Sequence, residues 1–352
     1  MTDERPRATQ VAPSPDTAGE PLPADVSPPA GGSRIGRVLR VQETGIVLVL
    51  VVIVALVAVG HPRFVSSQSL TNLGQQSAFF GIMALGVVFL LAMRELDLSV
   101  GSNYSVCTIV TAVLARDGLN PWLAAVLGVL LGAALGALNG ALANRFKLPV
   151  IIISLGTLSA YRGITQVVSH SSPVGGQPVE SSFYRWLGAT PFGIPSIIYL
   201  FVVLCALLTF VFRSTRFGYA VRAVGSNEEA ARLTGYPIAR VRLIVLTLLG
   251  ALSGLSGVFT LAYFGAADPG VGTGYELTVI AAAIIGGTGL AGGAGSVPGA
   301  LIGALLISVI VGGLTQLGVP ADWGQLVTGG VIVIAVGFDA VVRRRNRAGA
   351  RA

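Results

Sequence analysis

Long apolar runs separated by short polar segments occupy most of the chain. Most runs hold about 16 to 23 residues, close to the roughly 20 that cross a bilayer as an α-helix. Strands of a transmembrane barrel would instead alternate over about 10 residues each. The runs predict about ten spanning helices, at residues 45–60, 76–93, 100–115, 121–143, 148–168, 194–212, 243–264, 276–291, 296–314 and 324–342. We therefore expect an all-α, polytopic membrane protein.

Two pairs of these predicted helices flank segments that are unusual in a membrane. The polar run RELDLS at 94–99 separates the second helix from the third, and the glycine string GGTGLAGG at 286–293 separates the eighth from the ninth. Irregular backbone persists at membrane depth only where protein or water satisfies it. Each pair is therefore open to a second interpretation, as a short or broken helix or a re-entrant hairpin, which leaves eight full crossings.

Composition agrees with this pattern and sets the domain boundaries. Of 352 residues, 53% are hydrophobic and 11% are charged, against about 25% charged in soluble domains, which disfavours a soluble enzyme. The first 33 or so residues are rich in Pro, Ala, Ser and Gly, so we expect a disordered cytoplasmic tail over 1–40. Residues 41–342 then form the transmembrane domain, and 343–352 form a basic tail.

The basic residues orient the predicted helices. Arginines gather in the loop 213–242 and the tail 343–352, whereas the loops on the other side hold only Arg63, Arg116 and Arg185. Cytoplasmic loops carry the excess of Lys and Arg, so we expect a multi-pass protein of the inner membrane with both termini cytoplasmic. The net charge of +7 is thereby explained without nucleic acid as a partner.

The sequence lacks the patterns of a nucleotide or metal site. Lys147 is the only lysine and is followed by Leu and Pro, so the glycine string is not a P-loop. His61 and His170 are far apart, and both cysteines lie in apolar runs. These residues offer neither metal-ligand spacing nor a nucleophile beside a histidine. We expect no cofactor, no metal and no enzymatic activity in this chain.

The loop 213–242 contains a predicted short helix with its own caps. Asn227 is a favourable N-cap, and Glu228 and Glu229 suit the first turn of a helix dipole. Gly235 ends the helix and Pro237 prevents its continuation. We call this predicted helix the lever, because its compact, self-capped form suits docking into a groove of a partner protein. The alternative is an interfacial helix with no partner.

Four motifs, in order along the chain, resemble one family of transport proteins. The run NEEAARLTG at 227–235 is similar to the coupling helix of permease subunits in bacterial ABC importers of ribose, xylose and galactose-type monosaccharides. The same resemblance is carried by LDLSVGS at 96–102, by KLP at 147–149 through TLSAYRG at 157–163, and by YEL at 275–277 with the segment 281–295. One departure is the pair Arg94-Glu95, where the family pattern favours a small or apolar residue.

The resemblance implies an all-helical permease that works as a homodimer in membrane lipid. Two ATPase subunits would lie below it, and a soluble sugar-binding protein above it would meet the outer loop 169–193. ATP would be hydrolysed on another chain, in agreement with the missing P-loop. The residues expected to couple to the ATPase are Gly225, Asn227, Glu228, Glu229, Ala230, Ala231, Arg232, Leu233 and Gly235.

Polar side chains inside the predicted helices are the candidates for a solute pathway, because such groups are costly in a membrane and mark function by default. Hydroxyl-rich solutes suit neutral and acidic hydrogen-bonding groups. The candidates are Asp97, Ser99, Asn103, Asn139, Thr157 and Glu276. The structural alternative is that Arg94 or Arg162 pairs with a carboxylate and that the asparagines bond neighbouring helices.

Three other functions remain open at this point. One is an ABC permease for branched-chain amino acids, which has a similar organisation. A second is an ion-coupled secondary transporter, in which Asp97 and Glu276 would belong to an ion site. A scaffold without transport is the third, and it is disfavoured because it has no need for polar, glycine-broken segments at membrane depth.

Overall fold

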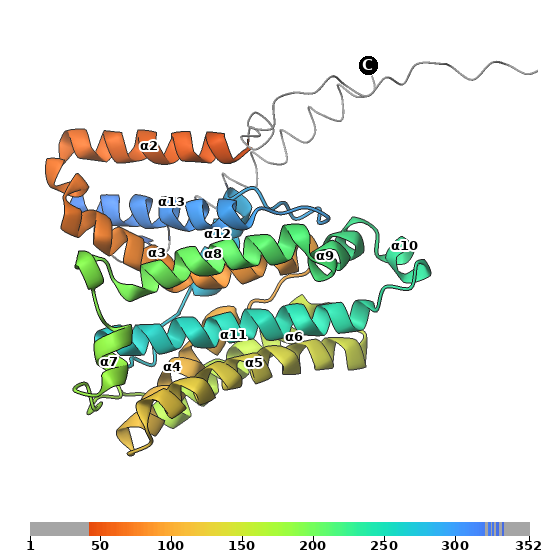
Figure 1. Ribbon diagram of the computed structural model, residues 1–352, viewed down its shortest axis with the longest axis horizontal. Helices are drawn as coiled ribbons and strands as arrows, with labels where there is room; N and C mark the ends of the chain where they lie inside the picture. Colours follow the sequence, from red (N-terminus) through yellow and green to blue (C-terminus); the bar gives the residue numbers. More distant parts are fainter. Residues whose placement is uncertain (1–41, 321–322, 325, 327–328, 331–332, 334–352) are drawn as a thin grey trace, which may run out of the picture. The chain divides into compact units, whose positions relative to one another are not determined.

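The computed structural model describes residues 42–320, 323–324, 326, 329–330 and 333. Within that part of the chain, long helices run side by side in a bundle (Figure 1). The α-helices are α2 Gln42–Gly60, α3 Ser67–Ala92, α4 Val100–Arg116, α5 Pro121–Phe146, α6 Val150–Ser169, α7 Ser182–Leu187, α8 Ser196–Ser214, α9 Arg216–Ser226, α10 Glu228–Leu233, α11 Ile238–Phe264, α12 Tyr275–Ile285 and α13 Val297–Gln316. Two 3₁₀ turns, η1 Pro62–Val65 and η2 Pro191–Gly193, lie between them.

The predicted all-α membrane fold is confirmed, whereas the count of about ten spanning helices is not. Six described helices are long and apolar enough to cross a membrane: α3, α5, α6, α8, α11 and α13. The predicted spans 45–60 and 276–291 contain the shorter apolar helices of α2 and α12. The span 324–342 lies largely outside the described residues, as do the predicted tails 1–40 and 343–352.

Two helix ends differ from the prediction for local reasons. Helix α3 begins at Ser67 rather than 76, because the Ser66 hydroxyl caps it by accepting a hydrogen bond from the Ser69 amide (3.3 Å). Its first turns are polar and carry no apolar pattern. Helix α12 ends at Ile285 rather than 291, where Gly287 takes a φ of +90°, which stops the helix.

Helix α3 is the central helix of the bundle. It packs against α8, α11, α12 and α13, and its residues from Ser77 to Ala92 are all buried. Helices that associate in lipid depend on close packing, since lipid is as apolar as their side chains. The end of α3 at Ala92 is therefore packed firmly against its neighbours, just before the polar run 94–99.

Helices α5 and α11 pack so closely that their backbones touch. A Cβ atom at Gly136 would overlap the carbonyl oxygen of Leu246, and one at Gly250 would overlap that of Gly132. Small residues at such positions let membrane helices approach backbone to backbone. This contact joins α5 to α11, the helix that follows the loop 213–242.

Candidate functional site

The predicted lever is present as helix α10, which follows α9 after a break at Asn227. The Asn227 side chain accepts a hydrogen bond from the Ala230 amide (3.0 Å), and Gly235 has a φ of +83° just beyond the helix end. The expected N-cap and glycine stop are both confirmed. Figure 1 shows α9 and α10 at one end of the bundle and α7 at the other.

Helix α10 is attached by one face and leaves the rest of its surface free. Ala231 is only 4% exposed and packs into the main apolar core, whereas Leu233 is 82% exposed. The charged side chains of Glu228, Glu229 and Arg232 are also exposed. An exposed leucine beside charges of both signs is suited to contact another protein.

The base of the lever meets the end of α3 and the glycine string. Arg94 Nη2 donates to the carbonyl oxygen of Ser226 (2.9 Å), and Arg94 Nε donates to that of Ala291 (2.6 Å). The amide of Gly293 donates to the carbonyl oxygen of Ala92 (2.8 Å). Arg94 therefore does not pair with a carboxylate, as one interpretation of the sequence expected, but with main-chain carbonyls of two distant segments.

Glu95, the next residue, pairs instead with the start of α11. Arg242 Nε donates to Glu95 Oε1 (2.5 Å), and Arg242 Nη1 donates to Asn144 Oδ1 on α5 (2.9 Å). Burial raises the pKa of the Glu95 carboxyl, and the Arg242 guanidinium opposes that rise. The segment after α3 is thus bonded to residues on both sides of the lever.

Three of the predicted pathway residues meet in one buried cluster. Asp97 Oδ1 accepts from both the amide (2.7 Å) and the hydroxyl (2.6 Å) of Ser99. Asn139 donates to Ser99 Oγ (2.8 Å) and Asp97 Oδ2 (3.3 Å). Tyr161 donates to Asn139 Oδ1 (3.1 Å). Tyr161 was not among the pathway residues predicted from the sequence, although it lies beside Arg162 in the motif TLSAYRG.

Of the other three predicted pathway residues, Thr157 lies beside Tyr161 at the edge of this cluster, whereas Asn103 and Glu276 lie outside it. Asn103 on α4 donates to the carbonyl oxygen of Gly132 (3.2 Å), which is the interhelix bond expected of an asparagine. Thr157 on α6 bonds its own helix, at the Ile153 and Ser154 carbonyls (3.3 and 3.4 Å). Glu276 stands in the first turn of α12.

Glu276 has an unsatisfied oxygen in a polar neighbourhood. Its Oε2 atom is buried without a hydrogen-bond partner among the described residues. Arg162 acts on Glu276 electrostatically, and its Nη1 donates to the carbonyl oxygen of Val271 (3.0 Å) in the loop before α12. A buried oxygen left without a partner is costly unless another group occupies the space.

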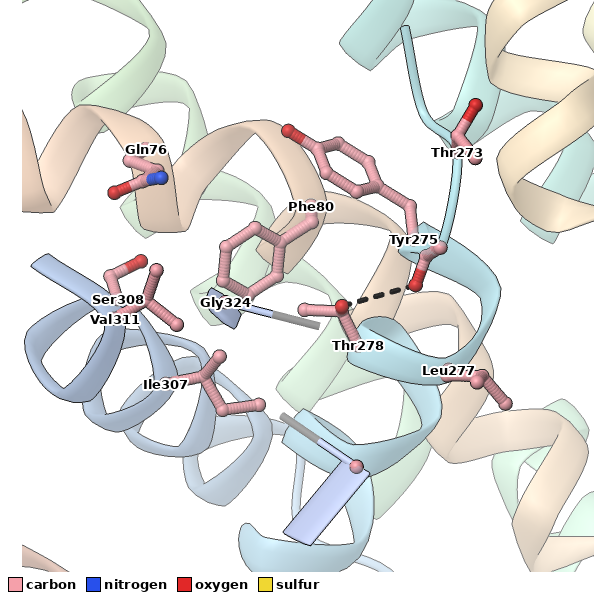
Figure 2. Close-up of a pocket in the computed structure, with 12 residues that line it drawn as sticks. Gln76, Phe80, Thr273, Tyr275, Leu277, Thr278, Ile307, Ser308, Val311 and Gly324 are labelled. Atoms are coloured by element: carbon pink, nitrogen blue, oxygen red, sulfur yellow. Dashed lines mark hydrogen bonds between the residues drawn. The ribbon is translucent and has the colours of Figure 1, made fainter. Parts of the chain in front are cut away.

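A cavity of about 310 Å³ lies beside the first turns of α12 (Figure 2). Figure 2 shows Gln76 and Phe80 of α3, Tyr275 and Thr278 of α12, and Ser308 of α13 around it. Among the described residues that line it, none carries a charged side chain. Volumes from about 300 Å³ upward are typical of small-molecule sites.

The cavity contains a hydroxyl that has no partner. Ser308 is 1% exposed, and its Oγ forms no hydrogen bond within the described part of the chain. Neither Ser308 nor Gln76 was singled out from the sequence, because a lone serine or glutamine in an apolar helix carries no distinctive pattern. Across the described residues, His, Cys, Asp and Glu side chains form no group of three or more that could hold a metal.

Comparison with known proteins identifies the family. A family described as "Branched-chain amino acid transport system / permease component" matches residues 69–336. The chain belongs to this family of permease components. The lever, the Asp97 cluster and the glycine string all lie within the matched part of the permease.

Curated relatives match nearly the whole permease. It is 36% identical over 302 residues to the ribose import permease of Bacillus subtilis (strain 168), which covers 85% of this chain and 92% of the relative. The D-allose transport system permease of Escherichia coli (strain K12) is 36% identical, over 86% of this chain and 93% of the relative. A probable ABC transporter permease of the same organism is 35% identical, over 87% and 92%.

A solved structure shares the fold. It is an inward-facing, putative metal-chelate type ABC transporter, with a TM-score of 0.50 and 14% sequence identity over 86% of this chain and 98% of the other. At this identity the likeness concerns the fold alone.

Proposed function

We propose that this permease is the membrane-spanning subunit of an ABC importer and carries a ribose-like monosaccharide across the inner membrane. ATP is hydrolysed by a separate subunit. The observation that carries the proposal is the exposed, self-capped lever α10, on a chain whose only lysine is not in a P-loop. The named sugars of the relatives, ribose and allose, support the choice of solute.

In this proposal the ATPase docks on α10 and moves it. The coupling residues are those from Gly225 to Gly235 named from the sequence, with the exposed Leu233 as the apolar contact and the exposed charges around it as the polar contacts. Movement of α10 switches the helices between outward-open and inward-open arrangements. A second copy of the permease and membrane lipid complete the assembly.

The solute pathway is proposed to include the six candidates named from the sequence. The cavity beside Tyr275 adds polar, uncharged groups, which suit a neutral solute rich in hydroxyls. A branched-chain amino acid, the solute in the family's description, carries two charges and would need charged partners. The described lining of this cavity holds no such partners, which favours a sugar.

The sugar-binding protein is proposed to dock at the outer loop 169–193. Part of this loop is held in place, because Phe183 is fully buried and Val174 pairs with Ala267. Two aromatic side chains remain outside, with Trp186 73% and Phe192 98% exposed. Aromatic residues on a rigid surface are typical anchors of a protein interface.

The docking of the ATPase is tested by reversing one charge on the lever. Glu229→Arg is expected to weaken association with the ATPase subunit by about tenfold, because the charge faces the proposed interface, and to uncouple ATP hydrolysis from ribose uptake. The measurements are co-purification with the ABC ATPase subunit, and uptake in proteoliposomes.

Glu180→Arg is the matched control, since Glu180 is an exposed glutamate of the outer loop. It should leave association unchanged, and both variants should insert normally into the membrane. If Glu229→Arg leaves association, ATP hydrolysis and uptake at wild-type levels, α10 has no coupling role.

A further inference from the structure

Arg94 joins two main-chain segments that are far away in the sequence. One acceptor, the Ser226 carbonyl, belongs to the residue just before the N-cap of the lever. The other, the Ala291 carbonyl, belongs to the loop between α12 and α13. Figure 1 shows that loop reaching toward α9. A guanidinium is suited to this task because its donors lie in one fixed plane and stay charged.

The backbones at Ala92, Gly225 and Gly293 pack against one another without side chains between them. A Cβ atom at Gly225 would overlap the Ala92 carbonyl oxygen and lie 2.8 Å from the Gly293 amide nitrogen. Arg94 itself has a φ of +64°, a left-handed conformation that costs energy for a residue other than glycine. The surrounding contacts hold it there, so the position of its side chain is fixed.

The loop that Arg94 contacts connects two helices that line the cavity, and its glycines suit it to act as a hinge. Residues 286–296 include Gly287, Gly292 and Gly293 with φ of +90°, +71° and +76°. The loop connects α12, which carries Tyr275 and Thr278, with α13, which carries Ser308. A continuous series of contacts therefore leads from the lever through Arg94 to the cavity.

We propose that Arg94 is a positioning residue that transmits movement of α10 to α12 and α13. We call its two bonds, to the Ser226 and Ala291 carbonyls, the Arg94 clamp. The inference rests on the proposed function in assuming that an ATPase moves α10. It adds the route of that movement. Arg94 bonds the residue that precedes the N-cap of the lever, and Glu95 bonds Arg242, which follows the lever. Coupling between distant sites requires an element with two arrangements, whose equilibrium both sites shift.

The test separates ATP hydrolysis from transport. Arg94→Gly removes the clamp and relieves the left-handed backbone, so the variant is expected to fold. In proteoliposomes with the ABC ATPase subunit and the binding protein, and ¹⁴C-ribose as solute, ATPase association and hydrolysis should persist. The ribose imported per ATP hydrolysed should fall about three- to thirtyfold. Arg94→Lys, which keeps the charge but not the fork, should be intermediate.

A second measurement needs no partner. In the purified permease, hydrogen exchange of the amides at 286–296, including the Gly293 amide bonded to Ala92, should be faster in Arg94→Gly. Exchange within α5 should not change. Arg116→Gly is the matched control, because in the described part of the chain Arg116 forms its ion pair with the exposed Asp117 next to it.

Three results would overturn the proposal, and one of them also overturns the function. An unchanged ratio of ribose to ATP in Arg94→Gly, or a parallel fall of both activities with unchanged exchange at 286–296, refutes the Arg94 clamp alone. Failure of the wild-type permease to bind any ATPase refutes the proposed function, and the transmission route falls with it.

Discussion

Adjacent residues at the end of α3 form bonds of different kinds. Within the described part of the chain, the exposed Arg94 bonds only main-chain carbonyls, whereas the Glu95 and Arg242 side chains are just 13% and 19% exposed. Removing one member of a partly buried pair leaves a charge without compensation. The exposed pair of Arg116 and Asp117 is screened by solvent and contributes little to stability. Arg94 and Glu95 are thus bonded to the segments that precede and follow the lever.

The Asp97 cluster leads to a prediction at the scale of one residue. Asp97→Ala removes the acceptor of the Ser99 and Asn139 hydrogen bonds, at a cost of about 1–3 kcal/mol for each donor left unpaired. We expect ribose uptake to fall at least about tenfold while the complex with the ATPase still assembles. The exposed Asp117→Ala should be neutral, and full uptake by Asp97→Ala would remove Asp97 from the pathway.

Residues with local signals were predictable from the sequence, and residues defined by distant partners were not. Asn227 and Gly235 fulfil roles set by their immediate neighbours, and the structure confirms both. The partners of Arg94 lie 132 and 197 residues away and are carbonyl groups, which every residue possesses. No sequence pattern identifies such a contact, and the lining residue Ser308 was missed for the same reason.

Helices were predicted in the right order because apolar length is a strong signal, but their ends depend on caps and glycines. Helices α5 and α8 fall within three residues of their predicted bounds. The start of α3 was displaced because its first turns are polar, and α12 was predicted too long because the glycine string is apolar. The sequence therefore supports the bundle and its connections, but not the length of every helix.

The contact between α5 and α11 gives a prediction at the scale of helices. Gly136→Val would force these helices apart, because a Cβ there overlaps the Leu246 carbonyl. We expect destabilisation of about 1–3 kcal/mol or more, measured as a lower midpoint of thermal unfolding in detergent. Gly156→Val is the control, since a Cβ at Gly156 meets nothing within 4 Å. Equal midpoints for the two variants would contradict this account of the packing.

At the scale of the whole molecule, the proposed function divides the work of transport between this permease and its partner chains. The lever α10 offers an exposed surface at one end of the bundle, and the Arg94 clamp connects that end to the helices around an uncharged cavity. In the proposed mechanism, the first of these parts receives movement and the second surrounds the solute. Its own sequence has no P-loop to supply the energy. The central claim is that the energy comes from ATP hydrolysed by a partner.

The most direct measurement is ribose uptake by proteoliposomes that contain the permease with or without its ATPase and binding protein, under controlled gradients. We predict that uptake requires the ATPase and ATP, and continues when ionophores collapse the proton and sodium gradients. Uptake by the permease alone, driven by an ion gradient and indifferent to ATP, would contradict the account and identify an ion-coupled transporter instead.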